Sequence, residues 1–488
     1  MQLWLDVARA HAPLLMIVFP FAAAALALAS PSARVAWIVA MLGALCATAS
    51  GADLCWRMFV LGLNPPAAAE GVALDVTGAG AFCATVLAGV STLALCAAGQ
   101  VTRDVRRRAA PMVFALASSA AGGWIAALFA RDVAAIFVAS EIAWLAGVAL
   151  LGATANEGRG ALNGALRMLT MGGAASAFML LGVGLLERGM GGSALALLYN
   201  DTIAAPRLAG VGAGLMIIAL AFKTGLTPLQ TWLGPAFSRA GASATLIVGV
   251  IGLSGALCVL VRLGEAAVAA PVIGDGVAAA LGVVAAATLV AGSIQAMGAH
   301  NLRRLIAYAG AAQAGGALIG VALGSPAGLA ASLEQIVVQC ASLLALFGAA
   351  ALTGERASLE SLDGLGRRAP LASAALALGM LGLMGAPLST GFLARWRLIE
   401  AGFGGGWWWT AGALIGASLA AVIFGGRILE RIYFRRATQA VVKASDPWRF
   451  ARAPALVVAI VVLLWGVEPS ALLRLADAAA QLDLGEGS

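Results

Sequence analysis

One lysine of this chain is placed where a side chain could take up and release a proton. Lys223 lies inside the apolar run GLMIIALAFKTGLTPLQTWL, and the second lysine, Lys443, lies in a basic stretch. The pKa of a lysine moves readily on burial, whereas arginine stays protonated, so Lys223 is a candidate proton carrier. The alternative is a cation held by a partner carboxylate for packing alone.

The composition indicates the elements that must position Lys223. Hydrophobic residues make up 61% of the 488 residues, charged residues 11%, and the mean hydropathy is +0.96. With about 20 apolar residues per span, the sequence predicts a polytopic membrane protein with about fourteen transmembrane helices. The predicted spans are residues 13–30, 34–52, 76–99, 110–130, 132–154, 163–187, 208–236, 242–263, 269–297, 302–323, 326–353, 370–400, 407–428 and 453–468.

An all-α bundle is favoured over a membrane β-barrel. The apolar runs are long and rich in Ala, Leu and Gly, and they lack the alternation of a barrel strand. The 62 glycines suit close helix packing through small residues. Apolar residues at helical spacing in residues 471–484 predict one more short helix, on the outer surface.

The arginines predict the orientation of the chain. They cluster in alternate loops, and cytoplasmic loops are enriched in Lys and Arg. The pattern therefore predicts a multi-pass protein of the inner (plasma) membrane with both termini outside, and it explains the net charge of +7 without nucleic-acid binding. The clustered residues are Arg103, Arg106, Arg107, Arg108, Arg159, Arg167, Arg239, Arg303, Arg304, Arg367, Arg368 and the arginines of 427–452.

No cofactor or metal is expected on this chain. The six cysteines lack metal-ligand spacing, and His11 and His300 are the only histidines. The glycines do not form a nucleotide-binding loop between a strand and a helix.

Two prolines mark a repeated feature of the sequence. Pro228 in AFKTGLTPLQTWL and Pro387 in MLGLMGAPLSTGFLARW each interrupt a long apolar run. A proline within a helix removes a backbone donor and frees carbonyls, which at membrane depth must be covered by protein or water. A matched pair of broken helices is typical of transporters built from repeats, while a packing kink is the simpler alternative.

Four stretches between about residues 75 and 435 carry a family resemblance. They are LFARDVAAIFVASEIAWLAGVALLG, FKTGLTPLQTWLGPAFSRAGASATLIVGVIG, HNLRRLIAYAGAAQAGGALIG and LDGLGRRAPLASAALALGMLGLMGAPLSTGFLARWRLIEAG. The chain resembles the antiporter-like membrane subunits of NADH:quinone oxidoreductase (respiratory complex I), which membrane-bound hydrogenases and Mrp-type sodium/proton antiporters share. The resemblance implies other membrane subunits of such a complex as partners and protons, or sodium, as the transported ions.

The resemblance also implies an organisation and a first pair of site residues. Residues 1–109 would form three N-terminal helices, residues 110–265 and 266–436 two inverted five-helix repeats, and residues 437–488 the last helix and a short tail. Glu141 and Lys223 would form the proton relay, because a nearby carboxylate favours the ammonium and its withdrawal leaves desolvation to expel the proton. A subunit of this kind has no redox centre of its own.

The chain departs from the family pattern in its second half. Ser254 stands where the eighth helix of the family carries a lysine or histidine. The eleventh-helix pattern of two histidines and a lysine reads Glu334, Val338 and Ser342. The twelfth-helix lysine or glutamate corresponds to Arg395, a fixed charge near the second break, because arginine does not release its proton.

Three interpretations stay open. In the first, protons still pass, with Glu334 as a relay and Ser254, Ser342 and Gln339 as a polar path; the intact Glu141 and Lys223 favour it. In the second, the chain is a non-conducting structural subunit of such a complex. In the third, it belongs to an Mrp-type antiporter and Glu334 offers oxygen ligands to sodium.

Overall fold

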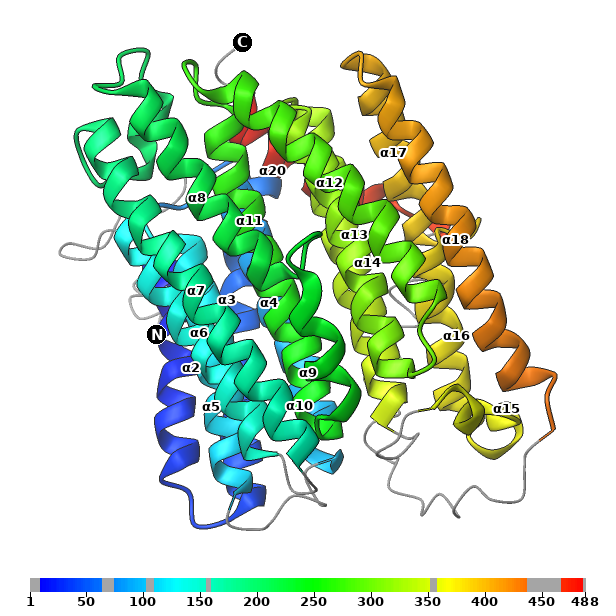
Figure 1. Ribbon diagram of the computed structural model, residues 1–488. Helices are drawn as coiled ribbons and strands as arrows, with labels where there is room; N and C mark the ends of the chain where they lie inside the picture. The colour runs from blue at the N-terminus through cyan, green and yellow to red at the C-terminus, as the bar shows by residue number, and fades with distance from the viewer. Residues whose placement is uncertain are drawn as a thin grey trace.

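The chain folds as a bundle of roughly parallel and antiparallel helices (Figure 1). The computed structural model describes residues 9–63, 74–101, 109–154, 159–351, 358–436 and 467–485. In this part, 11 helices are long and apolar enough to cross a membrane, and α2 and α16 are shorter apolar helices. Together they account for the first thirteen predicted spans, so the all-α membrane fold is confirmed. The span predicted at 453–468 lies largely outside the described residues.

The helix bounds follow the apolar runs. The first half contains α2 (Ala12–Leu28), α3 (Ala33–Cys55), α4 (Gly78–Val101), α5 (Ala110–Phe129), α6 (Val133–Ala153), α7 (Arg159–Met190), α8 (Pro206–Thr224), α9 (Leu233–Arg239), α10 (Ala242–Ile247) and α11 (Leu253–Val268). The second half contains α12 (Gly274–Met297), α13 (Leu302–Ala322), α14 (Pro326–Ala350), α15 (Leu365–Arg368), α16 (Pro370–Met384), α17 (Thr390–Gly404), α18 (Trp408–Tyr433) and α20 (Ser470–Leu484).

Local sequence signals set several helix starts. The hydroxyl of Ser325 accepts a hydrogen bond from the backbone N–H of Gly328, and Pro326 occupies the first turn of α14. The side chain of Asn301 accepts from the N–H of Arg304 at the start of α13. Such caps satisfy backbone donors that a helix leaves unpaired at its first turn.

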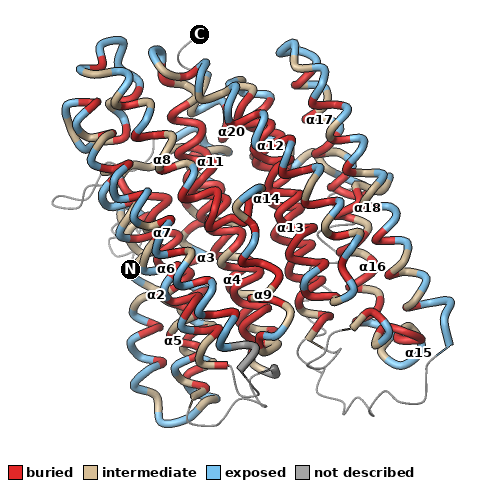
Figure 2. The backbone as a smooth tube through the Cα atoms, viewed as in Figure 1, coloured by how far each residue is buried: buried red, intermediate tan, exposed pale blue. Residues whose placement is uncertain are grey.

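The core of the bundle is formed by α11, α13 and α14. The apolar windows of α13 and α14 are 100% buried and that of α10 and α11 is 94% buried, whereas those of α3, α7 and α18 are 33% buried. Figure 2 shows the same contrast, with buried residues along the central helices and exposed ones along the outer faces. Polar groups on α11 and α14 are therefore enclosed by protein.

Both predicted breaks interrupt helices of the bundle. α8 ends at Gly225 with φ +82°, and α16 ends at Gly385 with φ +70°, in the left-handed region that favours glycine. Pro228 and Pro387 follow these glycines, and α9 and α17 continue beyond each break. A Cβ on Gly391 would lie 1.8 Å from the carbonyl oxygen of Gly382, so this close return of the chain requires glycine.

The predicted tail helix exists as α20 and packs near one end of the bundle, at the top in Figure 1, against α14 and α4. The carboxylate of Asp483 accepts hydrogen bonds from the N–H groups of Gly78 (2.6 Å) and Ala79 (2.7 Å) and so caps α4. We call the end of the bundle that carries α20 the α20 face. α9 and α15, with Arg239, Arg367 and Arg368, lie toward the opposite end.

The docking of α20 should depend on pH. Burial, which outweighs the two amide donors, raises the pKa of Asp483 from its ordinary 3.8 to about 6. The docked carboxyl therefore holds its proton more tightly than the free one. Docking should weaken as the pH rises from about 4 to about 6 and stay constant above that. Hydrogen exchange of the α20 amides across this range, corrected for intrinsic exchange, measures it; Asp483→Asn should remove the dependence, and a flat profile for the unmodified chain would contradict the expectation.

Candidate functional site

Lys223 and Glu141 form an ion pair at the first helix break. Lys223 lies in the last turn of α8, its side chain is fully buried, and its ammonium donates to Oε1 of Glu141 on α6. The same oxygen accepts a hydrogen bond of 2.7 Å from the hydroxyl of Ser176 on α7. Three helices that pack side by side thus bring a buried cation to a carboxylate that is itself held from the other side.

Solvent exposure differs between the two partners. The side chain of Glu141 is 16% exposed and that of Lys223 is 0% exposed. Trp144, one turn after Glu141 on α6, places its ring 5.7 Å from the ammonium of Lys223. An aromatic ring face attracts a cation, so the ammonium has a second stabilising contact when Glu141 moves away.

Aromatic side chains pack around the first break. The indole N–H of Trp232 donates to the carbonyl oxygen of Phe222 at 2.9 Å, and its ring centroid lies 5.1 Å from that of Trp144. This bond satisfies one backbone acceptor close to the break. A small pocket beside Lys223 is bounded by these tryptophans, by Trp124 and by the chain at Gly252.

The pocket leads from Lys223 toward α11. A π-helical turn, Val248–Gly252, joins α10 to α11 just before Ser254. Such turns are rare and often occur at functional sites. The hydroxyl of Ser254 is buried and interacts with the thiol of Cys340 on α14, but it makes no hydrogen bond of ordinary geometry with the described residues. Because buried polar groups are normally paired, this hydroxyl is a place where water would bind.

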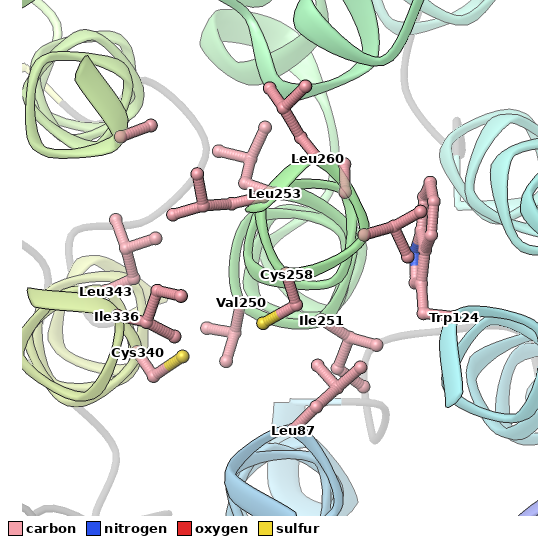
Figure 3. Close-up of a cluster of buried hydrophobic side chains, with 14 of the residues drawn as sticks. Leu87, Trp124, Val250, Ile251, Leu253, Cys258, Leu260, Ile336, Cys340 and Leu343 are labelled. Atoms are coloured by element: carbon pink, nitrogen blue, oxygen red, sulfur yellow. The ribbon is translucent and has the colours of Figure 1, made fainter. Parts of the chain in front are cut away.

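The contact between α11 and α14 is apolar. α8 packs on α11, α11 on α14, and α14 on α16 and α17, so this contact lies between the two breaks. Figure 3 shows Cys258 of α11 and Cys340 of α14 pointing into it, with Val250, Ile336 and Leu343 around them. Apart from the thiols of Cys258 and Cys340, the labelled side chains around this contact are apolar and cannot carry a proton.

Polar side chains resume on α14 and lead to the second break. The hydroxyl of Ser342 and the amide oxygen of Gln339 are buried and without partners in the described part of the chain. Gln335 donates to the amide oxygen of Gln313 on α13, and Gln313 donates to the carbonyl oxygen of Leu383 at 2.5 Å. This amide chain thus reaches a backbone carbonyl that the second break leaves free.

Arg395 donates to the same carbonyl and to the next one at the second break. The guanidinium is buried and donates to the carbonyl oxygens of Met384 (2.7 Å) and Leu383 (2.6 Å) and to the hydroxyl of Ser418. In the part of the chain that the structure describes, no carboxylate forms an ion pair with Arg395. The N–H groups of Arg395 therefore replace the backbone donors that the broken helix lacks. The guanidinium also places a fixed positive charge there.

Glu334 lies apart from the pair at Lys223. It is buried on α14 and pairs with Arg397 of α17, which also pairs with Asp477 of α20. The structure thus brings Glu141 and Lys223 together and places Glu334, predicted as part of the same relay, in a separate network.

Sequence reasoning missed several of these polar residues. Arg397 lies two positions after Arg395 in the quoted twelfth-helix motif, so its charge was visible, but its partner Asp477 is 80 residues away. Ser176 and Gln313 carry no charge, and one hydroxyl or amide in an apolar run does not distinguish a functional partner from a helix-packing contact.

Loss of the Ser176 hydroxyl should have a modest effect. Ser176→Ala removes one donor to Glu141 and leaves the ion pair with Lys223. A single hydrogen bond to a charged group contributes about 1.5–3 kcal/mol, which limits the change in proton-transfer rate to between about tenfold and about a hundredfold. Transport assays on membranes with equal amounts of the chain measure it, with Ser50→Ala, on the exposed side of α3, as the control. A total loss of transport would contradict a supporting role.

The family model and the curated relatives agree on one family. Residues 130–420 match the family model described as NADH:quinone oxidoreductase/Mrp antiporter, transmembrane. NADH-quinone oxidoreductase subunit N of Mycobacterium bovis is 28% identical over 385 residues, 76% of this chain and 71% of that protein. The subunit N of Desulforudis audaxviator is 29% identical over 461 residues, 90% and 89% of the two chains.

Solved structures share the fold. A chain of the Mrp complex from Dietzia sp. superposes with a TM-score of 0.83 at 22% identity and covers 97% of both chains. A chain of respiratory complex I from Thermus thermophilus superposes with a TM-score of 0.77 at 22% identity, over 95% of this chain and 98% of that one.

Proposed function

Because the chain belongs to the NADH:quinone oxidoreductase/Mrp antiporter transmembrane family, we propose that it is a proton-translocating membrane subunit of a multi-subunit complex. Its curated relatives are named as subunits of NADH-quinone oxidoreductase, which favours a redox complex of that type over a lone antiporter. The chain supplies the proton path, and other subunits supply the driving reaction.

The observation that carries the proposal is the ion pair at the first break. Lys223 is fully enclosed, bound to Glu141 and beside a small pocket. While Glu141 is close, the charged ammonium is favoured; once Glu141 is withdrawn or neutralised, burial disfavours the charge and the proton leaves. An isolated charge at this depth costs about 2.5–3.5 kcal/mol, so small movements of Glu141 control a large effect.

The remaining path uses the second half of the chain. Residues 110–265 and 266–436 act as two repeats, each with one broken helix. The proton leaves Lys223 along the pocket toward Ser254, and water bound at the unpaired groups of Gln339 and Ser342 extends the path on α14. Arg395 stays charged and sets the electrostatic potential at the second break.

A structural role for the second half is the second candidate, and the apolar contact between α11 and α14 favours it. If Cys258, Cys340 and their neighbours stay dry, Lys223 exchanges protons within the first half only (Figure 3). The chain would then still dock its partners through the outer faces of the bundle.

The orientation follows from the arginines. The end of the bundle with Arg239, Arg367 and Arg368 faces the cytoplasm, and the α20 face lies on the outer side of the plasma membrane. Protons accordingly enter from the end with α9 and α15 and leave at the α20 face.

One purification followed by one assay tests the proposal. The tagged chain is isolated from its native membrane in mild detergent, and its partners are identified by mass spectrometry. The complex is then reconstituted in liposomes containing a pH-sensitive dye. Redox partners and acidification driven by their substrate, independent of sodium, are expected. Strict sodium dependence would mean that sodium, not the proton, is the transported ion. Turnover without acidification would favour the structural role.

A further inference from the structure

Three charged residues from α14, α17 and α20 form one network at the α20 face. The guanidinium of Arg397 on α17 donates through Nη1 to Oε1 of Glu334 on α14 and through Nη2 to Oδ1 of Asp477 on α20. The oxygen Oε2 of Glu334 is buried and has no hydrogen-bond partner among the described residues. The proposed route runs along α14 by Gln339 and Ser342, and Glu334 lies on the same helix.

The charges of the network do not balance. Two carboxylates share one guanidinium, so the set carries a net charge of −1 when all groups are ionised. Glu334 is the enclosed carboxylate of the two, and a proton bound there removes the cost of holding its charge out of water. The free oxygen of Glu334 is the atom that lacks a donor, so a proton bound there satisfies both the charge and the hydrogen bond.

Exposure increases stepwise along the network. The side chain of Glu334 is 2% exposed, that of Arg397 is 21% exposed, and that of Asp477 is 41% exposed. Arg397 therefore holds an enclosed carboxyl close to an exposed carboxylate at the α20 face, but it keeps its own protons and does not relay one. A purely structural ion pair does not need an acid at each end of such a gradient.

α20 is anchored independently of this network. Leu472, Ala476, Ala479 and Ala480 are its buried residues, and Asp483 caps α4 at the far end. Asp477 thus contributes its carboxylate to Arg397 without being the sole attachment of α20, which makes it separable by mutation.

We infer that Glu334, Arg397 and Asp477 form a proton-release site, in which Glu334 binds the proton, Asp477 passes it to water at the α20 face, and Arg397 holds the two carboxylates in register. The inference rests on the proposed function and adds its exit. The proton leaves the Glu334 carboxyl for a water molecule, that water gives a proton to the Asp477 carboxylate, and Asp477 releases it to solvent; Glu334 becomes a carboxylate paired with Arg397, which keeps its own protons.

The test uses the intact native complex in liposomes with an internal pH dye. Asp477→Asn keeps the shape and a hydrogen-bond acceptor but cannot take a proton, and about tenfold slower acidification is expected. Asp477→Glu should retain transport. Asp483→Asn, on the same helix and outside the network, is the matched control and should transport normally. Lys223→Ala runs in parallel as the control for the proposed function.

Each outcome separates the two claims. If Lys223→Ala abolishes transport and Asp477→Asn leaves it unchanged, the release site is wrong and the proposed function stands. If Lys223→Ala transports normally, the proposed function itself fails. If Asp483→Asn slows transport as much as Asp477→Asn, or if every substitution at position 477, glutamate included, prevents assembly, the network serves to dock α20 and the release site is wrong.

Discussion

Proteoliposomes carrying the complex with Lys223→Ala should lose acidification by about a hundredfold or more, since a positioned proton carrier contributes that much to a proton-transfer step. The substitution removes the ammonium that carries the proton at the first break. It also leaves Glu141 with Ser176 as its remaining described partner. Since Glu141 is partly exposed, it can take up a proton or bind water, and the chain should still assemble.

The matched variant is Lys223→Arg. Arginine preserves the positive charge opposite Glu141 but does not release its proton, so the complex should assemble and transport should stay low. Initial rates of dye response, normalised to the amount of assembled complex, measure both variants. Transport by Lys223→Arg near the unmodified rate would mean that only the charge matters, and the proton-carrier role of Lys223 would be withdrawn.

The first break was predictable because its chemistry is local in the sequence. Lys223, Gly225 and Pro228 lie within one short segment, and a lysine in an apolar run is costly enough to require a reason. The helices themselves were predictable because each apolar run has the length of a membrane span.

The network at the α20 face was not predictable, because it depends on which helices meet. Arg397 joins Glu334, 63 residues before it, to Asp477, 80 residues after it. The tail helix was expected on the outer surface, but only packing against α14 shows that one of its carboxylates turns inward.

The apolar contact between α11 and α14 was also not predictable from the sequence, because it too depends on which helices meet. Cys258 and Cys340 are unremarkable residues in two apolar runs, and helical periodicity alone does not tell which faces of two central helices meet when both are buried all round. The loss of titratable residues at Ser254 and Ser342 was visible in the sequence, but the apolar contact beside them required the structure.

The second large effect is expected at Arg395. Arg395→Met keeps most of the apolar volume but removes the donors to the carbonyl oxygens of Leu383 and Met384 and to the hydroxyl of Ser418. The carbonyl oxygen of Leu383 still accepts from Gln313, so only that of Met384 loses its described donor, and a buried acceptor left unpaired costs about 1–3 kcal/mol. The complex should melt at a lower temperature or fail to assemble, as thermal shift and native gels would show.

Arg427→Met is the control for this effect. Arg427 on α18 is partly exposed and donates to a single carbonyl oxygen, that of Met297 at 2.6 Å, so its loss should cost markedly less. Arg395→Lys distinguishes charge from geometry: one ammonium retains the positive charge but cannot reproduce the forked contact with both carbonyls. If Arg395→Lys restores transport but only part of the stability, Arg395 acts on the proton path through its charge and on the broken helix through its donors. If Arg395→Met assembles with unchanged melting, the free carbonyls of the break are satisfied without it, and the fixed-cation role would have to be abandoned.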